Sequence, residues 1–202
     1  MAAASSNAPV FVGLTGAVAA GKSEALAAFE RLGAATLSSD AVVHELLGTE
    51  RARDLLIGRW GPDVAPDGRI DRARVGEIVF SSPEELEWLE ATLHPLVGER
   101  IKSWGEELPA STRVAVVEVP LLFETGMERH FDATVSVIAP QEVRGERAAA
   151  QGLSELEARA GRQLSQEEKA KRATYVVRNE GSLEALEAEL ARLLADLEAG
   201  LG

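Results

Sequence analysis

The sequence lacks cysteine, positive charge in excess and long apolar runs. Without cysteine it has no disulfide bonds and no thiolate catalysis, and a reducing cytoplasm is its simplest location. Its 21 Lys and Arg against 33 Asp and Glu leave a formal charge of −12, which argues against a nucleic-acid partner, because such proteins present a basic face. No apolar run approaches the roughly 20 residues that span a bilayer, so no membrane partner is expected.

Residues 1–9 have neither the basic region nor the apolar core of a secretory signal, so we expect a disordered tail. The remainder, residues 10–202, has the length and composition of one globular domain: 46% of the whole chain is hydrophobic and 27% charged. An acidic domain of this kind can bind polyphosphate only through local features, such as loop amides and a few placed cations.

One glycine-containing loop fits that requirement. An apolar run over residues 10–15 precedes a match to the phosphate-loop pattern G-x-x-x-x-G-K-[ST], and apolar residues at helical spacing follow it up to Gly33. A strand before and a helix after are the context that this pattern requires. The loop comprises Gly16, Ala17, Val18, Ala19, Ala20, Gly21, Lys22 and Ser23. The alternative is a chance strand–turn–helix built of small residues, which the combined context disfavours.

The loop predicts a phosphate site because backbone N–H groups and the helix dipole both favour an anion at a helix N-terminus. Lys22 is expected to reach the β- and γ-phosphates of a nucleotide, and the Ser23 hydroxyl to ligate Mg²⁺. The sequence therefore predicts a nucleotide-binding α/β domain.

Further strands are expected at residues 34–38, 113–119, 133–139 and 175–177, and in a parallel sheet their carboxyl ends share one edge with the loop. Asp40 follows the first of them. It is a candidate base for an attacking hydroxyl, or a water-mediated Mg²⁺ ligand; it could equally cap a helix over residues 41–47. Glu118 and Glu124 are acids at the end of another strand, and Glu124 is a candidate substrate contact.

Residues 49–110 form a mainly helical stretch that is too long for a simple crossover, so we expect an inserted lobe that holds the acceptor substrate. The pair His94-Pro95 lies in its longest helical pattern, where proline bends a helix. His94 could point its ring at substrate. From the residues alone, a packed histidine at a bend is favoured.

Residues 141–172 are charged and rich in arginine, as expected for a helical lid that closes over transferring phosphate. The alternative is a solvated helical surface whose arginines pair with Glu146, Glu155 and Glu157. With a substrate lobe at residues 49–110 and a lid at residues 141–172, the core of the domain would consist of residues 10–48, 111–140 and 173–202. Five arginines are candidates for the closing contact: Arg144, Arg147, Arg159, Arg162 and Arg172.

Taken together, these residues resemble the dephospho-coenzyme A kinases from about Val12 to Leu194. The Leu-His-Pro-Leu and Pro-Leu-Leu-x-Glu stretches, in this order, are far more specific than the phosphate loop alone. The stretches that carry the resemblance follow one another along the chain at residues 13–16 with the loop, 37–40, 93–97, 119–124, 147–163 and 176–179. The resemblance implies a P-loop kinase three-layer α/β fold with a five-stranded parallel sheet, an inserted helical substrate lobe and a helical lid.

The resemblance also implies that ATP and Mg²⁺ are used to phosphorylate the ribose 3′-hydroxyl of dephospho-CoA. It assigns Asp40 as the base, His94 and Pro95 as acceptor contacts, Arg147 as the lid arginine and Asn179 as a residue near the adenine of ATP. Lys22 and Arg147 would act on the transferring phosphoryl group.

This chain departs from the family pattern at Ala17 and Ala19, where glycine is usual, and at Glu24, where threonine is usual. These departures predict weaker nucleotide binding through the cofactor-binding residues 16–24. Ser38 replaces the first acid of an Asp-x-Asp pattern. The rivals are a kinase for another nucleoside or small alcohol, a GTPase, which the lack of an Asn-Lys-x-Asp sequence disfavours, and a weakly active nucleotide-binding regulatory module.

Overall fold

A computed structural model describes residues 8–150 and 163–200. Two compact units divide the chain: the core unit holds the residues through Ser38 and from Leu108 onward, and the helical unit is Ser39–Glu107. The helical unit thus begins ten residues before the boundary at 49 that the sequence suggested. The physical reason is that the helix after Ser38 packs against the long helix of the helical unit.

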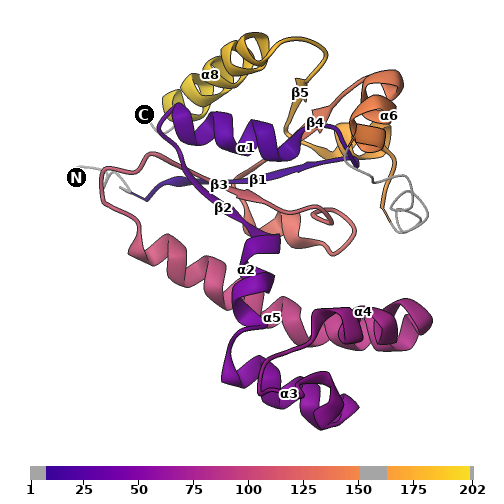
Figure 1. Cartoon of the computed structure of the whole chain (residues 1–202). Helices are drawn as coiled ribbons and strands as arrows, with labels where there is room; N and C mark the ends of the chain where they lie inside the picture. Colours follow the sequence, from indigo (N-terminus) through magenta and orange to yellow (C-terminus); the bar gives the residue numbers. More distant parts are fainter. Residues whose placement is uncertain (1–7, 151–162, 201–202) are drawn as a thin grey trace. The chain divides into compact units, whose positions relative to one another are not determined.

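The core unit is built on one sheet of five parallel strands in the order β2-β3-β1-β4-β5 (Figure 1). This confirms the expected α/β architecture and its five-stranded parallel sheet. The strands are β1 (Val10–Gly16), β2 (Ala35–Ser38), β3 (Val114–Glu118), β4 (Ala133–Ile138) and β5 (Tyr175–Arg178). Each lies within a residue or two of its expected position, because buried parallel strands are short and almost continuously apolar.

The register brings the carboxyl ends of the strands to one edge. Leu14 of β1 pairs with Glu118 of β3, and Ser38 of β2 pairs with the same glutamate. On the other side Gly16 pairs with Val137. The phosphate loop leaves the sheet from this edge, where ligands of open α/β sheets bind.

Helices cover the sheet and complete its core. Helix α1 (Lys22–Arg31) packs against α8 (Leu183–Ala199), and five leucines of α8 are buried in the core. The short helix α7 (Gln166–Arg172) packs on β1 and β4, and α6 (Gln141–Ala150) follows β4 (Figure 1). A 3₁₀ turn, η2 (Met127–His130), precedes β4. The fold thus holds α1 and α6 at the carboxyl edge of the sheet.

The helical unit contains α2 (Ser39–Leu46), α3 (Glu50–Trp60), the 3₁₀ turn η1 (Pro62–Val64), α4 (Arg72–Ser81) and α5 (Pro83–Glu107). Its helix starts follow local chemistry. Thr49 and Asp71 are N-caps whose side chains accept hydrogen bonds from backbone amides three residues ahead, and Pro83 is the first residue of α5.

A second apolar core, centred on Leu56 and Val75, holds the helical unit together. At its rim the rings of Trp60 and Trp88 meet edge to face, with centroids 5.1 Å apart. The Arg59 guanidinium lies 5.4 Å from the Trp88 ring centroid. This core is distinct from the one beneath the sheet, so each unit has an apolar interior of its own.

One local expectation in the helical unit is wrong. Asp40 does not cap a helix over 41–47: α2 already begins at Ser39, so Asp40 is its second residue, in the first turn. The long helical pattern that contains His94 and Pro95 forms one helix, because α5 runs continuously from Pro83 to Glu107 through Pro95. Packing against α2 and α4 keeps the helix intact across a residue that local propensity disfavours.

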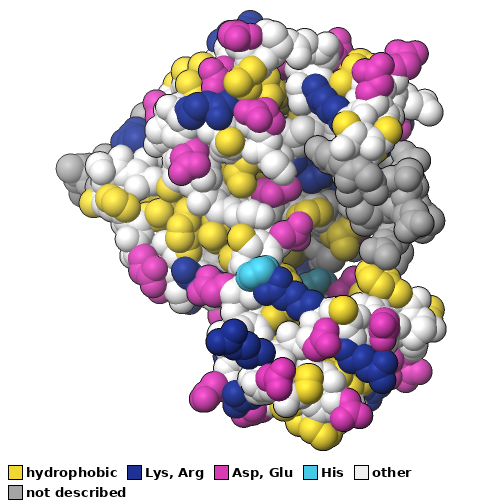
Figure 2. All heavy atoms as spheres, viewed as in Figure 1, with side chains coloured by type: hydrophobic (Ala, Val, Ile, Leu, Met, Phe, Trp, Pro, Cys, Tyr) yellow, Lys and Arg dark blue, Asp and Glu magenta, His cyan; other side chains and the backbone are white. Residues whose placement is uncertain are grey.

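Acidic and basic side chains are interspersed on the visible surface, although the chain is acidic overall (Figure 2). Among residues 8–150 and 163–200, no helix combines the length and apolarity needed to cross a membrane.

Candidate active site

The phosphate loop joins β1 to α1 through a tight turn. Gly21 is the N-cap of α1 and lies in the left-handed region, at φ 93° and ψ 31°. Ala19 also has a positive φ, 58°, which an L-residue with a Cβ adopts at a steric cost. The loop therefore keeps a phosphate-loop shape although alanine stands where glycine is usual in the family that it resembles.

Two glycines of the loop have no room for a side chain. A Cβ on Gly16 would lie 2.5 Å from the Val137 carbonyl oxygen, because β1 and β4 approach closely there. A Cβ on Gly21 would lie 2.0 Å from the Asn179 Nδ2 atom. These two positions require glycine for close approach, and at Gly21 the positive φ adds a second reason.

Lys22 is the first residue of α1, and its ammonium bends back over the loop. Its Nζ donates to the Ala17 carbonyl oxygen at 3.1 Å. Ser23, one residue further, is exposed in the first turn of the helix. The lysine charge and the serine hydroxyl are thus both held at the helix N-terminus, where the helix dipole also favours an anion.

Two arginines of α6 add positive charge to the same loop. Arg144 donates from Nε to the Val18 carbonyl oxygen at 3.0 Å, and Arg147 donates from Nη2 to the Asn179 Oδ1 atom at 3.3 Å. The other terminal nitrogen of Arg147, Nη1, is buried and has no hydrogen-bond partner among the described residues. A buried guanidinium N–H without an acceptor is unfavourable, so this atom is suited to an incoming anion.

Asn179 braces the loop from the end of β5. It is 5% exposed, its Nδ2 donates to the Ala20 carbonyl oxygen at 3.0 Å, and its Oδ1 accepts from Arg147. The side chain thus links the phosphate loop to α6. Contact with adenine, which the resemblance implies for Asn179, stays a prediction.

Glu24 is paired with a cation. It forms an ion pair with Arg31, two turns along α1, at 3.0 Å, and Arg31 also pairs with Glu187 of α8. The negative charge that this departure from the family pattern brings near the loop is therefore partly balanced within α1.

The acids near the end of β3 have protein partners. Glu118 is 7% exposed and accepts a hydrogen bond from the Ser38 hydroxyl at 3.2 Å. Glu124 forms an ion pair with the Lys169 ammonium at 3.0 Å and accepts from the Leu164 amide at 2.8 Å. Both contacts use the Oε1 atom, whereas the Oε2 atom is buried and has no hydrogen-bond partner among the described residues. The predicted role of Glu124 as a substrate contact stays a prediction.

Lys169 is a buried cation beside Glu124 that sequence reasoning missed. It is fully buried on α7, and its ammonium donates to the Pro120 carbonyl oxygen at 2.6 Å and to the Thr15 hydroxyl at 3.4 Å. Burial lowers the pKa of this ammonium, and the Glu124 carboxylate opposes that change. Nothing in the charged sequence of α7 distinguishes Lys169 from Lys171, which is exposed. Only the tertiary contacts reveal it.

The other predicted residues belong to the helical unit. Asp40 is exposed in the first turn of α2, and His94 and Pro95 are exposed on α5, which packs against α2. Of the remaining lid arginines, Arg172 is exposed at the end of α7, whereas Arg159 and Arg162 lie outside the described residues. The structure thus brings Lys22, Arg147 and Asn179 together in the core unit.

A family model described as dephospho-CoA kinase matches residues 10–185. The chain belongs to the dephospho-CoA kinase family. A protein with that name from Thermus thermophilus is 38% identical over 195 residues, which cover 95% of this chain and 94% of the relative. Another, from Deinococcus radiodurans, is 40% identical over 195 residues, covering 94% and 93%.

Solved structures agree with this family assignment. A crystal structure of a Thermus thermophilus protein superposes with a TM-score of 0.81 at 39% identity, covering 94% of this chain and 98% of that one. A dephospho-CoA kinase from Campylobacter jejuni gives 0.70 at 25% identity, with the same coverage. A shikimate kinase from Bacteroides thetaiotaomicron, at 18% identity and a TM-score of 0.51, shares the fold alone.

Proposed function

We propose that this protein transfers the γ-phosphoryl group of ATP to the ribose 3′-hydroxyl of dephospho-CoA, giving ADP and CoA. The observation that carries the proposal is the convergence of Lys22, Arg144 and Arg147 on one phosphate loop in a chain of this family. Three cations on a helix N-terminus are suited to a transferring phosphoryl group, whose charge is spread over several oxygens. The proposed location of this reaction is the cytoplasm, the simplest location for a chain without cysteine.

Lys22 would neutralise the β- and γ-phosphate oxygens in this reaction. Its present acceptor, the Ala17 carbonyl, lies within the loop itself, so the ammonium can exchange a neutral acceptor for a charged phosphate without leaving its place. Arg147 would direct its Nη1, which has no hydrogen-bond partner among residues 8–150 and 163–200, at the same phosphates. These contacts strengthen as charge develops on the transferring group, which is what lowers the barrier.

The residues present also fit Mg²⁺ bound together with ATP. Mg²⁺ usually keeps several waters and takes one or two protein oxygens besides substrate phosphates. Ser23 offers an exposed hydroxyl in the first turn of α1, and no cluster of three or more acidic or histidine side chains suited to a metal occurs in the described part of the chain. Ser23 would hold the ion, which would supply charge neutralisation to the phosphates.

Asp40 would orient the 3′-hydroxyl and accept its proton, while His94 and Pro95 would contact the acceptor. Asp40 is exposed and lies two residues after the end of β2 in sequence, at the start of the helical unit. Positioning and electrostatics would provide most of the rate enhancement, with the base a smaller contributor. The proposed roles therefore divide by unit: the core unit binds ATP, and the helical unit binds dephospho-CoA.

A coupled assay of ADP release with dephospho-CoA tests the reaction, with mass spectrometry to locate the new phosphate on the 3′-oxygen. Adenosine and other alcohols serve as competing acceptors. A clear preference for dephospho-CoA is expected, since the family assignment favours it over the rival kinase and the regulatory module. Preference for another acceptor would replace the proposed substrate.

Two variants test the residue roles in the same assay. Lys22→Ala should abolish turnover, and a fully active variant would show that the phosphate loop does not take part in the reaction.

Asp40→Asn should lower kcat by about 10² or more while ADP binding is retained, because the general base acts only in the reaction. Asp63→Asn, a change at an exposed acid of η1, is the matched control and should keep the wild-type kcat.

A further inference from the structure

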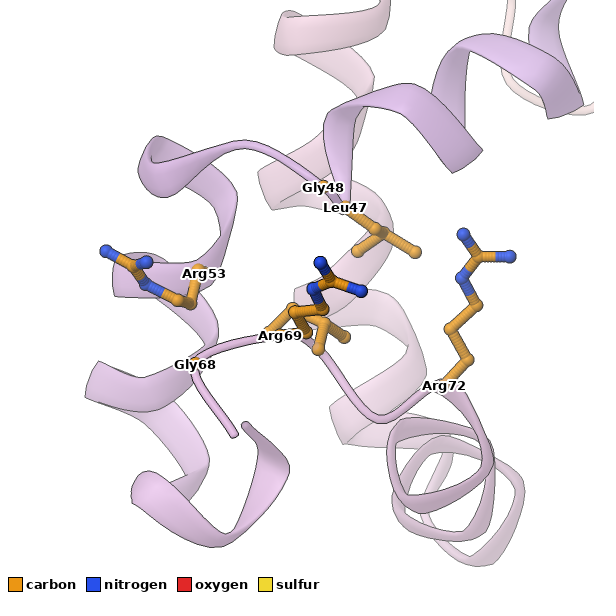
Figure 3. Close-up of a pocket in the computed structure, with 7 residues that line it drawn as sticks. Leu47, Gly48, Arg53, Gly68, Arg69 and Arg72 are labelled. Atoms are coloured by element: carbon orange, nitrogen blue, oxygen red, sulfur yellow. The ribbon is translucent and has the colours of Figure 1, made fainter. Parts of the chain in front are cut away.

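The helical unit contains a pocket that none of the proposed residues lines. Its cavity volume is about 230 Å³, and it lies between the end of α2, the first turns of α3 and the segment leading into α4 (Figure 3). Three arginines, Arg53, Arg69 and Arg72, line it together with Leu47, Ile70 and two glycines. The chain has a net charge of −12, whereas three cations and no carboxylate line this pocket. The pocket is therefore positively charged although the protein as a whole is negatively charged.

Two of the three guanidinium groups are available to a ligand. Arg69 is exposed and has no acidic partner among the described residues, and Arg72 is exposed with only the His44 ring as its partner. Their heads lie on either side of Leu47 in Figure 3. Arg53 differs: its head donates to Asp54 at 3.1 and 3.2 Å and points away from the other two. Arg53 contributes the aliphatic part of its side chain and its positive charge to the pocket, whereas Arg69 and Arg72 offer N–H donors to a ligand.

The partner of Arg72 is a histidine ring and not a carboxylate. A guanidinium is always a donor, so the His44 Nδ1 atom accepts from it. This acceptor carries no negative charge, so it leaves the Arg72 charge unbalanced. The pair thus orients the guanidinium without neutralising it.

We infer that this pocket binds the diphosphate group of the acceptor, an inference that rests on the proposed function. Guanidinium groups match phosphate oxygens with paired hydrogen bonds, and two of them suit a diphosphate. Dephospho-CoA carries its diphosphate between adenosine and an extended pantetheine chain. Leu47 and Ile70 provide apolar surface beside the two cations for the adjoining chain.

The size of the cavity agrees with a charged segment and not a whole ligand. Sites that enclose a drug-sized molecule measure roughly 300–1,000 Å³, and this pocket is smaller. Arg69 and Arg72 would then act as specificity residues: they would discriminate acceptors with a diphosphate from nucleosides that lack one. Their loss would weaken acceptor binding and leave the phosphoryl-transfer step itself intact.

Steady-state kinetics of Arg69→Gln, Arg72→Gln and the double variant test this assignment. The KM for dephospho-CoA should rise by about tenfold for each arginine, the usual effect of losing a charged hydrogen bond. The kcat and the KM for ATP should stay within about twofold of wild type. Arg74→Gln is the matched control, because Arg74 lies on α4, pairs with Glu77 and does not line the pocket.

Amide spectra of ¹⁵N-labelled protein locate the ligand directly. Inorganic diphosphate and dephospho-CoA should shift the Gly48 and Gly68 resonances, since both glycines line the pocket, whereas adenosine should not. The double variant should lose these shifts. If ATP moves the two signals more strongly than dephospho-CoA does, the assignment to the acceptor is overturned.

The two proposals fail in different ways. If wild type phosphorylates dephospho-CoA and all arginine variants keep its KM, the pocket assignment is wrong and the proposed function stands. If wild type does not phosphorylate dephospho-CoA but diphosphate still shifts Gly48 and Gly68, the reaction is wrong and the diphosphate site stands.

Discussion

Ala19 is the described non-glycine residue whose φ is positive, and it lies in the centre of the phosphate loop. The family pattern usually has glycine there, which adopts this conformation without steric cost. An L-residue in the left-handed region is disfavoured by about 1–2 kcal/mol. The loop nevertheless keeps its shape because Asn179, Arg144 and the β1–α1 connection hold it from outside.

Ala19→Gly should therefore raise the free energy of unfolding by up to about 1 kcal/mol, since strain relief exceeds the added backbone entropy of about 0.5–1 kcal/mol. Urea denaturation measures the change. Ala20→Gly is the control. The Ala20 methyl group is fully buried and the φ of Ala20 is not positive, so this variant should lower the free energy of unfolding by about 1 kcal/mol or more. A loss of stability in Ala19→Gly would show that Ala19 is not strained.

At the scale of elements, α7 makes its most buried polar contacts with the rest of the core unit through one cation, Lys169. Lys169 contacts the Glu124 carboxylate and the Pro120 carbonyl, which belong to the segment after β3, and Thr15, which precedes the phosphate loop. The contacts thus join α7 to the strand that carries the loop. A buried charge with several partners is costly to break, although the intact pair is not itself a large source of stability.

Lys169→Met should destabilise the protein by about 3 kcal/mol, because it leaves Glu124 partly buried without its cation. The double variant Lys169→Met with Glu124→Leu should recover much of that loss, and a urea double-mutant cycle measures the coupling. Lys171→Met, an exposed change on the same helix, should have little effect. Equal losses in the single and double variants would contradict the ion-pair account.

In the helical unit, Glu85 links α3 to α5. It accepts two hydrogen bonds from Arg59, at 2.8 and 3.0 Å, and one from the Trp60 indole at 2.7 Å. The Arg59 guanidinium and then the indole hold the pKa of the Glu85 carboxyl below its ordinary value of 4.5. A depressed carboxyl pKa stabilises the fold above pH 4.5, and this contribution is lost as pH falls through the folded-state pKa.

The helical unit of the wild type should accordingly lose stability as pH falls below 4.5, and Glu85→Gln should show a shallower loss over that range. Tryptophan emission during urea unfolding measures it, because all three tryptophans of the chain lie in residues 39–107. Glu84→Gln, the exposed neighbour, is the control. Parallel pH profiles for wild type and Glu85→Gln would contradict the predicted linkage.

At the scale of the whole molecule, the chain combines an acidic surface with two small groups of cations. One consists of Lys22, Arg144 and Arg147 on the phosphate loop, and the other lines the pocket of the helical unit. The charge of −12 repels polyphosphates in general, so only sites with placed donors can bind them. This arrangement favours selective binding of anions at defined positions.

ADP should stabilise the folded protein because it binds the native loop and not the unfolded chain. At 100 times its Kd the gain is about 2.7 kcal/mol, which for a chain of this length raises Tm by roughly 5–10 °C. Far-UV circular dichroism measures the shift. Lys22→Ala should lose most of it; a Tm that ADP leaves unchanged in wild type would contradict nucleotide binding by the loop.

The sequence by itself determined the elements and the loop. Apolar runs, the spacing of leucines in α8 and the G-x-x-x-x-G-K-[ST] pattern are local signals, so β1, α1 and the parallel sheet could be predicted from short stretches. The start of α2 was missed because packing between helices outweighs local propensity there.

Only the tertiary structure decided which charged side chains meet. Arg144 and Val18 are 126 residues apart, and Asn179 and Ala20 are 159 apart, so no local pattern pairs them. Lys169 has the same kind of sequence surroundings as exposed lysines, and Arg69 and Arg72 resemble any surface arginines until α2, α3 and α4 are assembled. Hydrophobic periodicity determines secondary structure, whereas the convergence of polar groups depends on long-range packing.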